Sequence, residues 1–83
     1  MFDVIIENAS HALSHQLAIY DIFKSHLAPG GLYVIEDVAC LDSSRELFEK
    51  IDPSRRVDIL DRRALKGRFD DVLVLIKDLA APL

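Results

Sequence analysis

Short apolar runs, separated by polar residues and turn formers, divide the first half of the chain into regular elements. Residues 2–6 are short and β-branched, which is typical of a buried strand. Apolar side chains recur every three or four positions over 12–27, predicting an amphipathic helix with Gln16 outside its apolar stripe. The Pro-Gly-Gly run at 29–31 then ends this helix, and residues 32–35 form a second apolar strand. Strand, helix and strand in this order predict a right-handed βαβ unit.

The second half predicts one more helix and two more strands. Ser43 and Glu46 have the spacing of a capping box, which marks the start of a helix. Residues 57–60 predict a short third strand, and 71–76, the longest apolar run, predict a central strand. Only the basic connection 62–69 separates these strands, which favours an antiparallel pair over a crossover. The expected fold is α/β, a small mixed sheet with the element order β-α-β-α-β-β.

Composition narrows the functional classes. The chain has 83 residues, of which 51% are hydrophobic and 29% charged, so we expect residues 1–83 to form a single small domain. A net charge of −4 provides no basic field for nucleic acid, and no apolar run approaches the ~20 residues of a membrane span. We therefore expect neither a nucleic-acid nor a membrane partner. The single cysteine, Cys40, cannot form an internal disulfide, which fits a cytoplasmic protein.

Polar side chains follow the first two predicted strands. Asn8, Ser10 and His11 come after residues 2–6, and Glu36 and Asp37 come after residues 32–35. The carboxyl ends of parallel strands meet at one edge of a sheet, where neighbouring strands stand ~4.8 Å apart. A cluster of oxygen ligands suits Mg²⁺, and an imidazole that titrates near pH ~6.5 suits a general base. The alternative is that polar residues simply terminate two apolar strands.

Two strings in order carry a resemblance to a known family. The first is residues 2–6 leading into Ser10-His11, and the second is the run Leu27 to Asp37, which ends in Glu-Asp. Together with the terminal antiparallel pair, they resemble the C-terminal half of class I S-adenosylmethionine-dependent methyltransferases. More narrowly, they resemble the metal-dependent O-methyltransferases of macrolide-sugar tailoring. The resemblance implies half of a Rossmann-like methyltransferase fold.

The resemblance also implies a metal site and a base. In that family, an acidic residue three before the histidine binds magnesium together with the Glu-Asp pair, and the histidine is the proposed base for a sugar hydroxyl. These roles fall on Glu36 and Asp37 as metal ligands and on His11 as catalytic base. Asn8 stands where the family has aspartate. It still offers a neutral oxygen to the metal, but the site has one negative charge fewer.

The family binds its methyl donor on three earlier strands, beginning with a glycine-rich turn. Nothing in residues 1–83 supplies these elements, because Gly30-Gly31 follows a helix and precedes a strand. We therefore expect a truncated methyltransferase-like domain, without a cofactor-binding site for S-adenosylmethionine and without activity of its own. One alternative is a magnesium-assisted O-methyltransferase fragment that needs a separate donor-binding half. Another is a scaffold module that keeps the metal site as a structural feature.

The missing half predicts a partner. In the family fold, the strand equivalent to residues 2–6 is central, whereas here it becomes an edge that is apolar on both faces. Such edges recruit another strand. We expect either a homodimer through residues 2–6, with its two edge strands antiparallel about a two-fold axis, or pairing with a separate donor-binding half.

Overall fold

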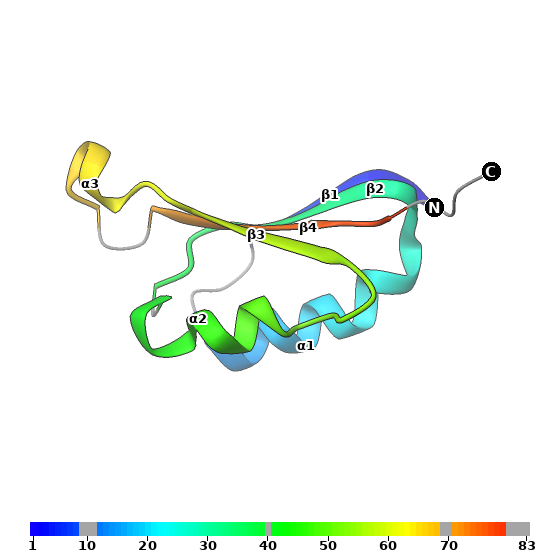
Figure 1. Ribbon diagram of the computed structural model, residues 1–83, viewed down its shortest axis with the longest axis horizontal. Coiled ribbons are helices and arrows are strands. Elements are labelled where there is room, and N and C mark those ends of the chain that lie inside the picture. Colours follow the sequence, from blue (N-terminus) through cyan, green and yellow to red (C-terminus); the bar gives the residue numbers. More distant parts are fainter. Residues whose placement is uncertain (9–11, 40, 69–70, 80–83) are drawn as a thin grey trace.

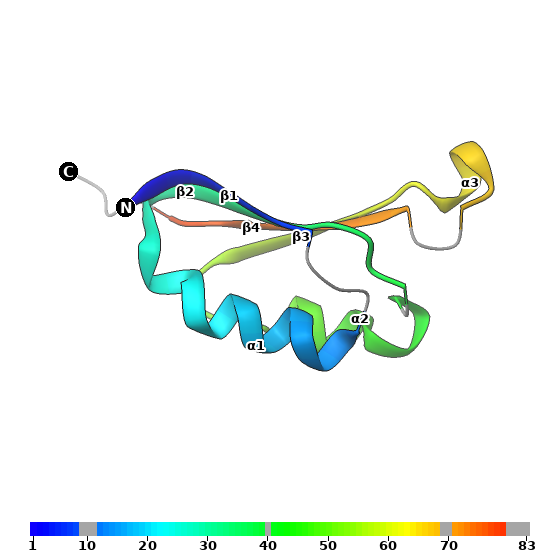
Figure 2. The same ribbon diagram turned by 180° about the vertical axis from the view of Figure 1, so that it is seen from behind.

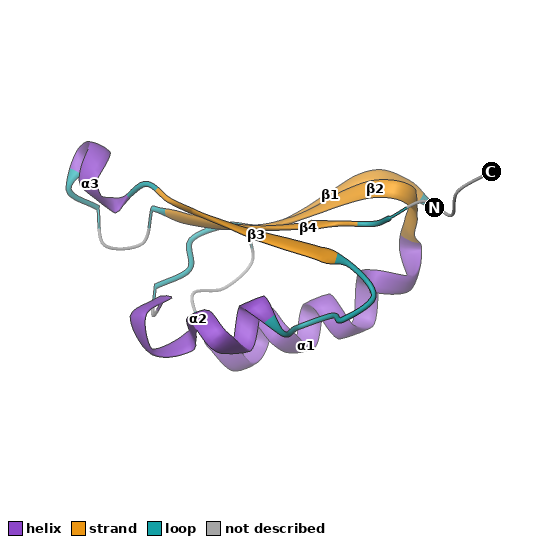
Figure 3. Cartoon of the chain, in the orientation of Figure 1, coloured by secondary structure: helices purple, strands orange, loops and turns teal. Residues whose placement is uncertain are grey.

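The structure is a computed structural model that describes residues 1–8, 12–39, 41–68 and 71–79. Its elements alternate between strands and helices along the chain (Figure 3). In order, they are β1 (Phe2–Glu7), α1 (Leu13–Phe23), the 3₁₀ turn η1 (Lys24–His26), β2 (Leu27–Ile35), α2 (Leu41–Glu49), β3 (Arg56–Asp61), α3 (Arg63–Lys66) and β4 (Val72–Lys77).

The strands form one four-stranded mixed sheet in the order β1-β2-β4-β3. β1 runs parallel to β2, as the predicted βαβ unit requires. β4 lies between β2 and β3 and is antiparallel to both. The α/β class, the terminal antiparallel pair and the central position of the last strand are therefore confirmed.

Helices α1 and α2 lie on the same face of the sheet, as the two opposite views show (Figures 1 and 2). Because side chains alternate along a strand, every second residue of β2 and β4 points to these helices. These residues are fully buried together with aromatic side chains of the helices; the core comprises Tyr20, Leu27, Tyr33, Ile35, Val38, Leu41, Phe48, Val72, Val74 and Ile76. The hydrophobic core thus lies between the sheet and its two main helices.

The opposite face of the sheet carries the alternate residues and is called the open face below. No helix of the described chain covers it (Figure 1). On β1 it exposes Phe2 by 61%, Val4 by 54% and Ile6 by 61%. Register pairs continue this apolar surface across the sheet, through Leu32, Val34, Leu75, Leu73 and Leu60. The sheet is therefore apolar on both faces but covered on one.

The first helix ends earlier than its apolar spacing predicts. α1 stops at Phe23, and Leu27 belongs to β2, so the Pro-Gly-Gly run lies inside that strand rather than before it. A close approach of β1 and β2 explains the change. A Cβ on Gly31 would lie 2.8 Å from the Ala28 carbonyl oxygen and 2.9 Å from that of Asp3, so only glycine fits there. Gly31 therefore allows the strand to begin early.

Two local expectations in the second half also change. α2 begins at Leu41, before the predicted capping box, so Ser43 lies inside the helix. Leu41 is only 1% exposed, and its burial favours a helix that starts at this residue. The basic connection holds the short helix α3, which Gly67 ends with a φ of 65°.

Arginines within and before the basic connection form ion pairs within the chain. Arg63 contacts Asp42 at 3.1 Å and Asp61 at 2.7 Å, and this cluster joins the start of α2 to the end of β3. Arg56 pairs with Asp58 at 3.0 Å along β3. Within the described residues, no helix is long and apolar enough to cross a membrane.

Candidate functional site

Two of the predicted polar segments meet at the carboxyl ends of β1 and β2. Glu7 and Ile35 are register partners, and the Glu36 amide donates to the Glu7 carbonyl at 3.0 Å. Asn8 and Glu36 therefore leave neighbouring strands at the same edge of the sheet. Asn8 is exposed, whereas Glu36 and Asp37 are half-buried. This edge, with Asn8, Glu36 and Asp37, is called the strand-end site below.

A buried glutamine holds the backbone of this site. Gln16 of α1 is fully buried, and its side-chain Nε2 donates to the carbonyls of Glu36 and Asp37, both at 3.3 Å. Asp37 adopts a left-handed conformation with φ of 57°, which turns the chain sharply after β2. Gln16 was predicted to lie outside the apolar stripe of its helix. This prediction is wrong, because its side chain points inward and donates hydrogen bonds to the loop that follows β2.

A buried carboxyl group lies beside the site, at the last position of β1. Glu7 is 5% exposed, and its Oε1 accepts a hydrogen bond of 2.7 Å from the Tyr33 hydroxyl. Its Oε2 has no hydrogen-bond partner among the described residues. Burial raises the pKa of Glu7 above its ordinary value of 4.5, although the Tyr33 hydrogen bond partly offsets this. Burial and the neighbouring Glu7 raise the pKa of Tyr33 as well.

An open groove of about 450 Å³ runs along β1 towards this end of the sheet. Its walls are mostly apolar and come from β1, α1 and β2. The groove is lined by Phe2, Val4, Ile5, Ile6, Glu7, Asn8, Ile19, Phe23 and Tyr33. The polar groups of Glu7 and Asn8 stand at one end of this apolar groove, which follows the free edge of the sheet.

The described side chains do not assemble a preformed metal centre. Among them, no three histidine, cysteine, aspartate or glutamate side chains gather closely enough to hold a metal ion. His11, the predicted base, and Ser10 lie outside the described residues. The strand-end site therefore brings together the backbone segments that carry Asn8, Glu36 and Asp37, while the metal role of these side chains stays a prediction.

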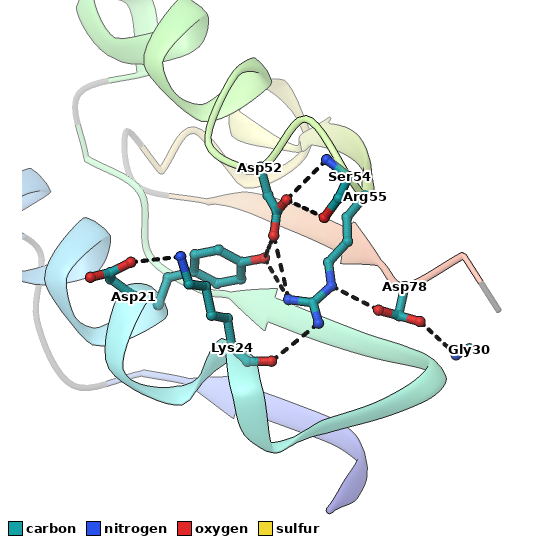
Figure 4. Close-up of polar contacts among 8 residues, drawn as sticks. Asp21, Lys24, Gly30, Asp52, Ser54, Arg55 and Asp78 are labelled. Atoms are coloured by element: carbon teal, nitrogen blue, oxygen red, sulfur yellow. Dashed lines mark hydrogen bonds and ion pairs between the residues drawn. The ribbon is translucent and has the colours of Figure 1, made fainter. Parts of the chain in front are cut away.

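A second polar cluster lies at the opposite end of the sheet and centres on Arg55 (Figure 4). Arg55 Nε donates to Asp78 at 2.9 Å, Nη1 to the Tyr20 hydroxyl at 2.9 Å, and Nη2 to the Lys24 carbonyl at 3.1 Å. Asp52 accepts from the Tyr20 hydroxyl at 2.7 Å. This Arg55 cluster ties the end of α1, the loop before β3 and the end of β4 together.

Neither the buried Glu7 nor the half-buried Arg55 cluster was evident from the sequence. Glu7 has the position of an ordinary polar strand terminator, and Arg55 belongs to a stretch that looks solvated. One available signal is that Gln16 lies four residues before Tyr20, on the face of α1 that packs on the sheet. A polar residue at a core-facing helical position indicates a buried hydrogen-bonding role.

Part of the amino-acid sequence is similar to segments of three curated enzymes. A segment of 37 residues is 43% identical to demethylmacrocin O-methyltransferase of Streptomyces fradiae, and 37 residues are 43% identical to mycinamicin VI 2''-O-methyltransferase of Micromonospora griseorubida. A segment of 36 residues is 47% identical to L-olivosyl-oleandolide 3-O-methyltransferase of Streptomyces antibioticus.

These matches cover 43–45% of this chain but only 9% of each enzyme. No family model matches the chain. The partial matches support a methyltransferase-like relationship for this α/β chain, over a short segment.

Proposed function

We propose that this chain is the acceptor-side portion of an O-methyltransferase-like domain, half of a Rossmann-like fold, that transfers no methyl group alone. The observation that carries the proposal is the meeting of Asn8 and Glu36-Asp37 at the carboxyl ends of two adjacent parallel strands. Ligands of open α/β sheets bind at this edge. The partial similarity to three O-methyltransferases adds support from an independent direction.

The donor set of the strand-end site fits a weakly held Mg²⁺. Asn8 offers a neutral amide oxygen, and Glu36 and Asp37 offer two carboxylates, which are hard oxygen ligands. Gln16 fixes the backbone of the two carboxylates through its hydrogen bonds to their carbonyls. A bound Mg²⁺ would polarise a hydroxyl of the acceptor, and His11 would accept the proton from that hydroxyl.

Thermal unfolding with and without Mg²⁺ tests the metal part of this proposal. A ligand that binds only the folded state raises its stability by mass action, so millimolar Mg²⁺ should raise the melting temperature. Glu36→Gln keeps the shape of the side chain but removes its charge, and should abolish the rise. Glu49→Gln, on α2, is the matched control and should keep the rise. An equal response to Mg²⁺ in both variants would show that the strand-end site holds no metal.

Calorimetric titration with S-adenosylmethionine tests the other part. The proposal expects no heat of binding from the isolated chain, because residues 1–83 contain no glycine-rich turn after a first strand. Measurable binding would overturn the view that the chain lacks a donor site.

A second candidate is that the chain is one half of a working O-methyltransferase whose donor-binding half is a separate polypeptide. The specific observation in its favour is the open face, which is apolar yet uncovered by any helix of the described chain. The parallel pair β1–β2 lies at one side of this sheet, and parallel strands are ordinarily covered on both faces. Methyl transfer to a hydroxylated acceptor on adding a donor-binding half, but not with this chain alone, would distinguish this candidate.

A further inference from the structure

The two edge strands of the sheet, β1 and β3, differ in the side chains that they expose to solvent. β3 carries Arg56 and Asp58 on its open-face side, and these residues form an ion pair at 3.0 Å. Charged side chains on an edge strand prevent pairing with other chains. β1 instead exposes Phe2, Val4 and Ile6 on the same face. Only the β1 edge is therefore suited to receiving another strand.

The backbone of β1 specifies which residues can pair. The Glu7 carbonyl points towards β2, because it accepts from the Glu36 amide. Successive residues of a strand direct their backbone groups to opposite sides, so the amides and carbonyls of Phe2, Val4 and Ile6 point to the free edge. An added strand must form its hydrogen bonds with these three residues.

Charge and the length of β1 together select one register for a second copy. A two-fold axis perpendicular to the sheet sets residues of the same face opposite one another. One residue must therefore lie opposite its own copy, and the axis passes between these two copies. An axis at Ile5 would set Asp3 opposite Glu7, and an axis at Asp3 would oppose two copies of Asp3. Like charges directly opposite destabilise a strand pair. An axis at Phe2 or Ile6 would overlap at most three residues of the two strands. An axis at Val4 opposes no like charges and overlaps residues 2–6, setting Phe2 opposite Ile6 and Asp3 opposite Ile5.

We propose that two copies of this chain pair antiparallel through β1, with the two-fold axis at Val4, to form one eight-stranded sheet. The pairing uses both apolar edges and leaves only the charged β3 edges outside, so the assembly closes at two copies. The groove along β1 is then occupied by the edge strand of the second copy. This inference rests on the proposed function in one respect, that β1 is an edge strand which pairs with a further strand.

Disulfide trapping tests the register. Directly opposed residues of a hydrogen-bonded antiparallel pair have Cα atoms ~5.5 Å apart, a separation that a disulfide spans. In a Cys40→Ser background, Val4→Cys should give a covalent dimer on mild oxidation, because the axis opposes this position to itself. Ile6→Cys is the matched control: it is exposed on the same face but lies opposite Phe2, so it should remain uncrosslinked. Crosslinking of Ile6→Cys but not Val4→Cys would overturn the register.

Sedimentation velocity tests the assembly without oxidation. The unmodified chain should sediment as a dimer at micromolar concentration, and Val4→Lys should convert it to a folded monomer by opposing two lysines at the axis. Leu60→Lys makes the same change at a similarly exposed position of β3 and should remain dimeric. Circular dichroism of each variant separates loss of pairing from loss of fold.

The possible outcomes separate this inference from the proposed function. A monomer of the unmodified chain, or a dimer that survives Val4→Lys, overturns the inference. Either result leaves the Mg²⁺ response of the strand-end site as a separate measurement. Conversely, a dimer with no Mg²⁺ response would retain the pairing and refute the metal site.

Discussion

At one end of the sheet Arg55 donates hydrogen bonds to Asp78, Tyr20 and Lys24, while at the other end Glu7 keeps a buried oxygen without a hydrogen-bond partner among the described residues. Both ends carry a buried tyrosine beside charged side chains, which are half-buried at the Arg55 cluster and buried at Glu7. At the Arg55 cluster, both carboxylates accept hydrogen bonds from described donors: Asp52 from Tyr20 and Ser54, and Asp78 from Arg55 and the Gly30 amide. Beside the strand-end site, the buried Glu7 carboxyl accepts one hydrogen bond, from the Tyr33 hydroxyl, and its other oxygen has none among the described residues. The first arrangement is typical of structural polar clusters, and the second of sites that receive a ligand or a proton.

The two ends should also respond to pH in opposite directions. Hydrogen bonds from the Gly30 amide and from Arg55 lower the pKa of Asp78, and those from Ser54 and Tyr20 lower that of Asp52 against the effect of its burial. Burial raises the pKa of Glu7. Acid therefore weakens the Arg55 cluster, whereas it neutralises the buried Glu7 carboxylate beside the strand-end site. The pKa shifts thus distinguish two groups that look alike in the sequence.

The largest expected effect comes from removing the guanidinium of the Arg55 cluster. Arg55→Ala leaves the half-buried Asp52 and Asp78 without their cation, and breaking these ion pairs should cost about 2–3 kcal/mol of unfolding free energy, towards the lower end of the range for buried pairs. Arg56→Ala, at the next position, removes an exposed ion pair and should change stability by less than about 0.5 kcal/mol. Urea unfolding of both variants measures the contrast. Equal losses would contradict a structural role for Arg55.

A smaller effect is expected from Gln16, which anchors the strand-end site. Gln16→Ala leaves the Glu36 and Asp37 carbonyls without a buried donor, which costs about 1–3 kcal/mol. It should also weaken any Mg²⁺ response, since the loop loses its anchor. Ser14→Ala, on the exposed side of the same helix, should leave both stability and the Mg²⁺ response close to those of the unchanged chain. Retention of the full Mg²⁺ response in Gln16→Ala would show that the anchor does not position the site.

The comparison of the two ends of the sheet also shows how much of this structure can be predicted from the sequence. The strands were predictable because each is a short apolar run, and the parallel pair because a helix separates Phe2–Glu7 from Leu27–Ile35. The early start of β2 was not predictable from the sequence, because it depends on the close approach of Gly31 to Asp3, which is distant in the chain. The inward side chain of Gln16 depends likewise on a loop twenty residues away. Such tertiary hydrogen bonds leave no periodic signal.

For the candidate site, the sequence predicted the edge at which Asn8 and Glu36 meet, since ends of adjacent parallel strands are neighbours. It did not predict Glu7 as a buried carboxyl, because a glutamate at a strand end is ordinarily exposed. The exposed apolar edge at β1 was expected from the resemblance, because the strand that lies beside residues 2–6 in the family is missing, and β1 is an exposed edge strand of the described sheet.

Glu7→Gln should sharpen the pH contrast between the two ends. The folded pKa of Glu7 lies above its unfolded value, so stability falls as the pH rises from about 4.5 through the raised pKa. Glutamine removes the buried charge and should stabilise the chain by about 1 kcal/mol at neutral pH, while abolishing this dependence. Stability below the ordinary pKa of Asp78, 3.8, should still fall in both proteins, since the Arg55 cluster is unchanged.

Unfolding free energies measured between pH 3 and 8 check this prediction. The unchanged chain should show a maximum in mildly acidic solution, and Glu7→Gln should show a plateau that extends to neutral pH. Asp58→Asn, on the exposed surface of β3, is the control and should keep the maximum. A Glu7→Gln variant that is less stable than the unchanged chain at pH 7 would mean that the carboxylate is matched by a group outside the described residues.

The smallest expected effect comes from Asn8, where one added charge should move the strand-end site towards metal binding. Asn8→Asp puts a third carboxylate beside Glu36 and Asp37, and like charges at an exposed edge repel by a few tenths of a kcal/mol. The variant should therefore melt slightly below the unchanged chain in the presence of a chelator. With Mg²⁺ the order should reverse, because affinity for a divalent cation rises with the number of charged oxygen ligands. Asn8→Ala, which removes the oxygen without adding charge, should show the weakest Mg²⁺ response. If Asn8→Asp and Asn8→Ala respond equally to Mg²⁺, the side chain at this position does not contact the metal, and the contrast between the two ends would rest on Glu7 alone.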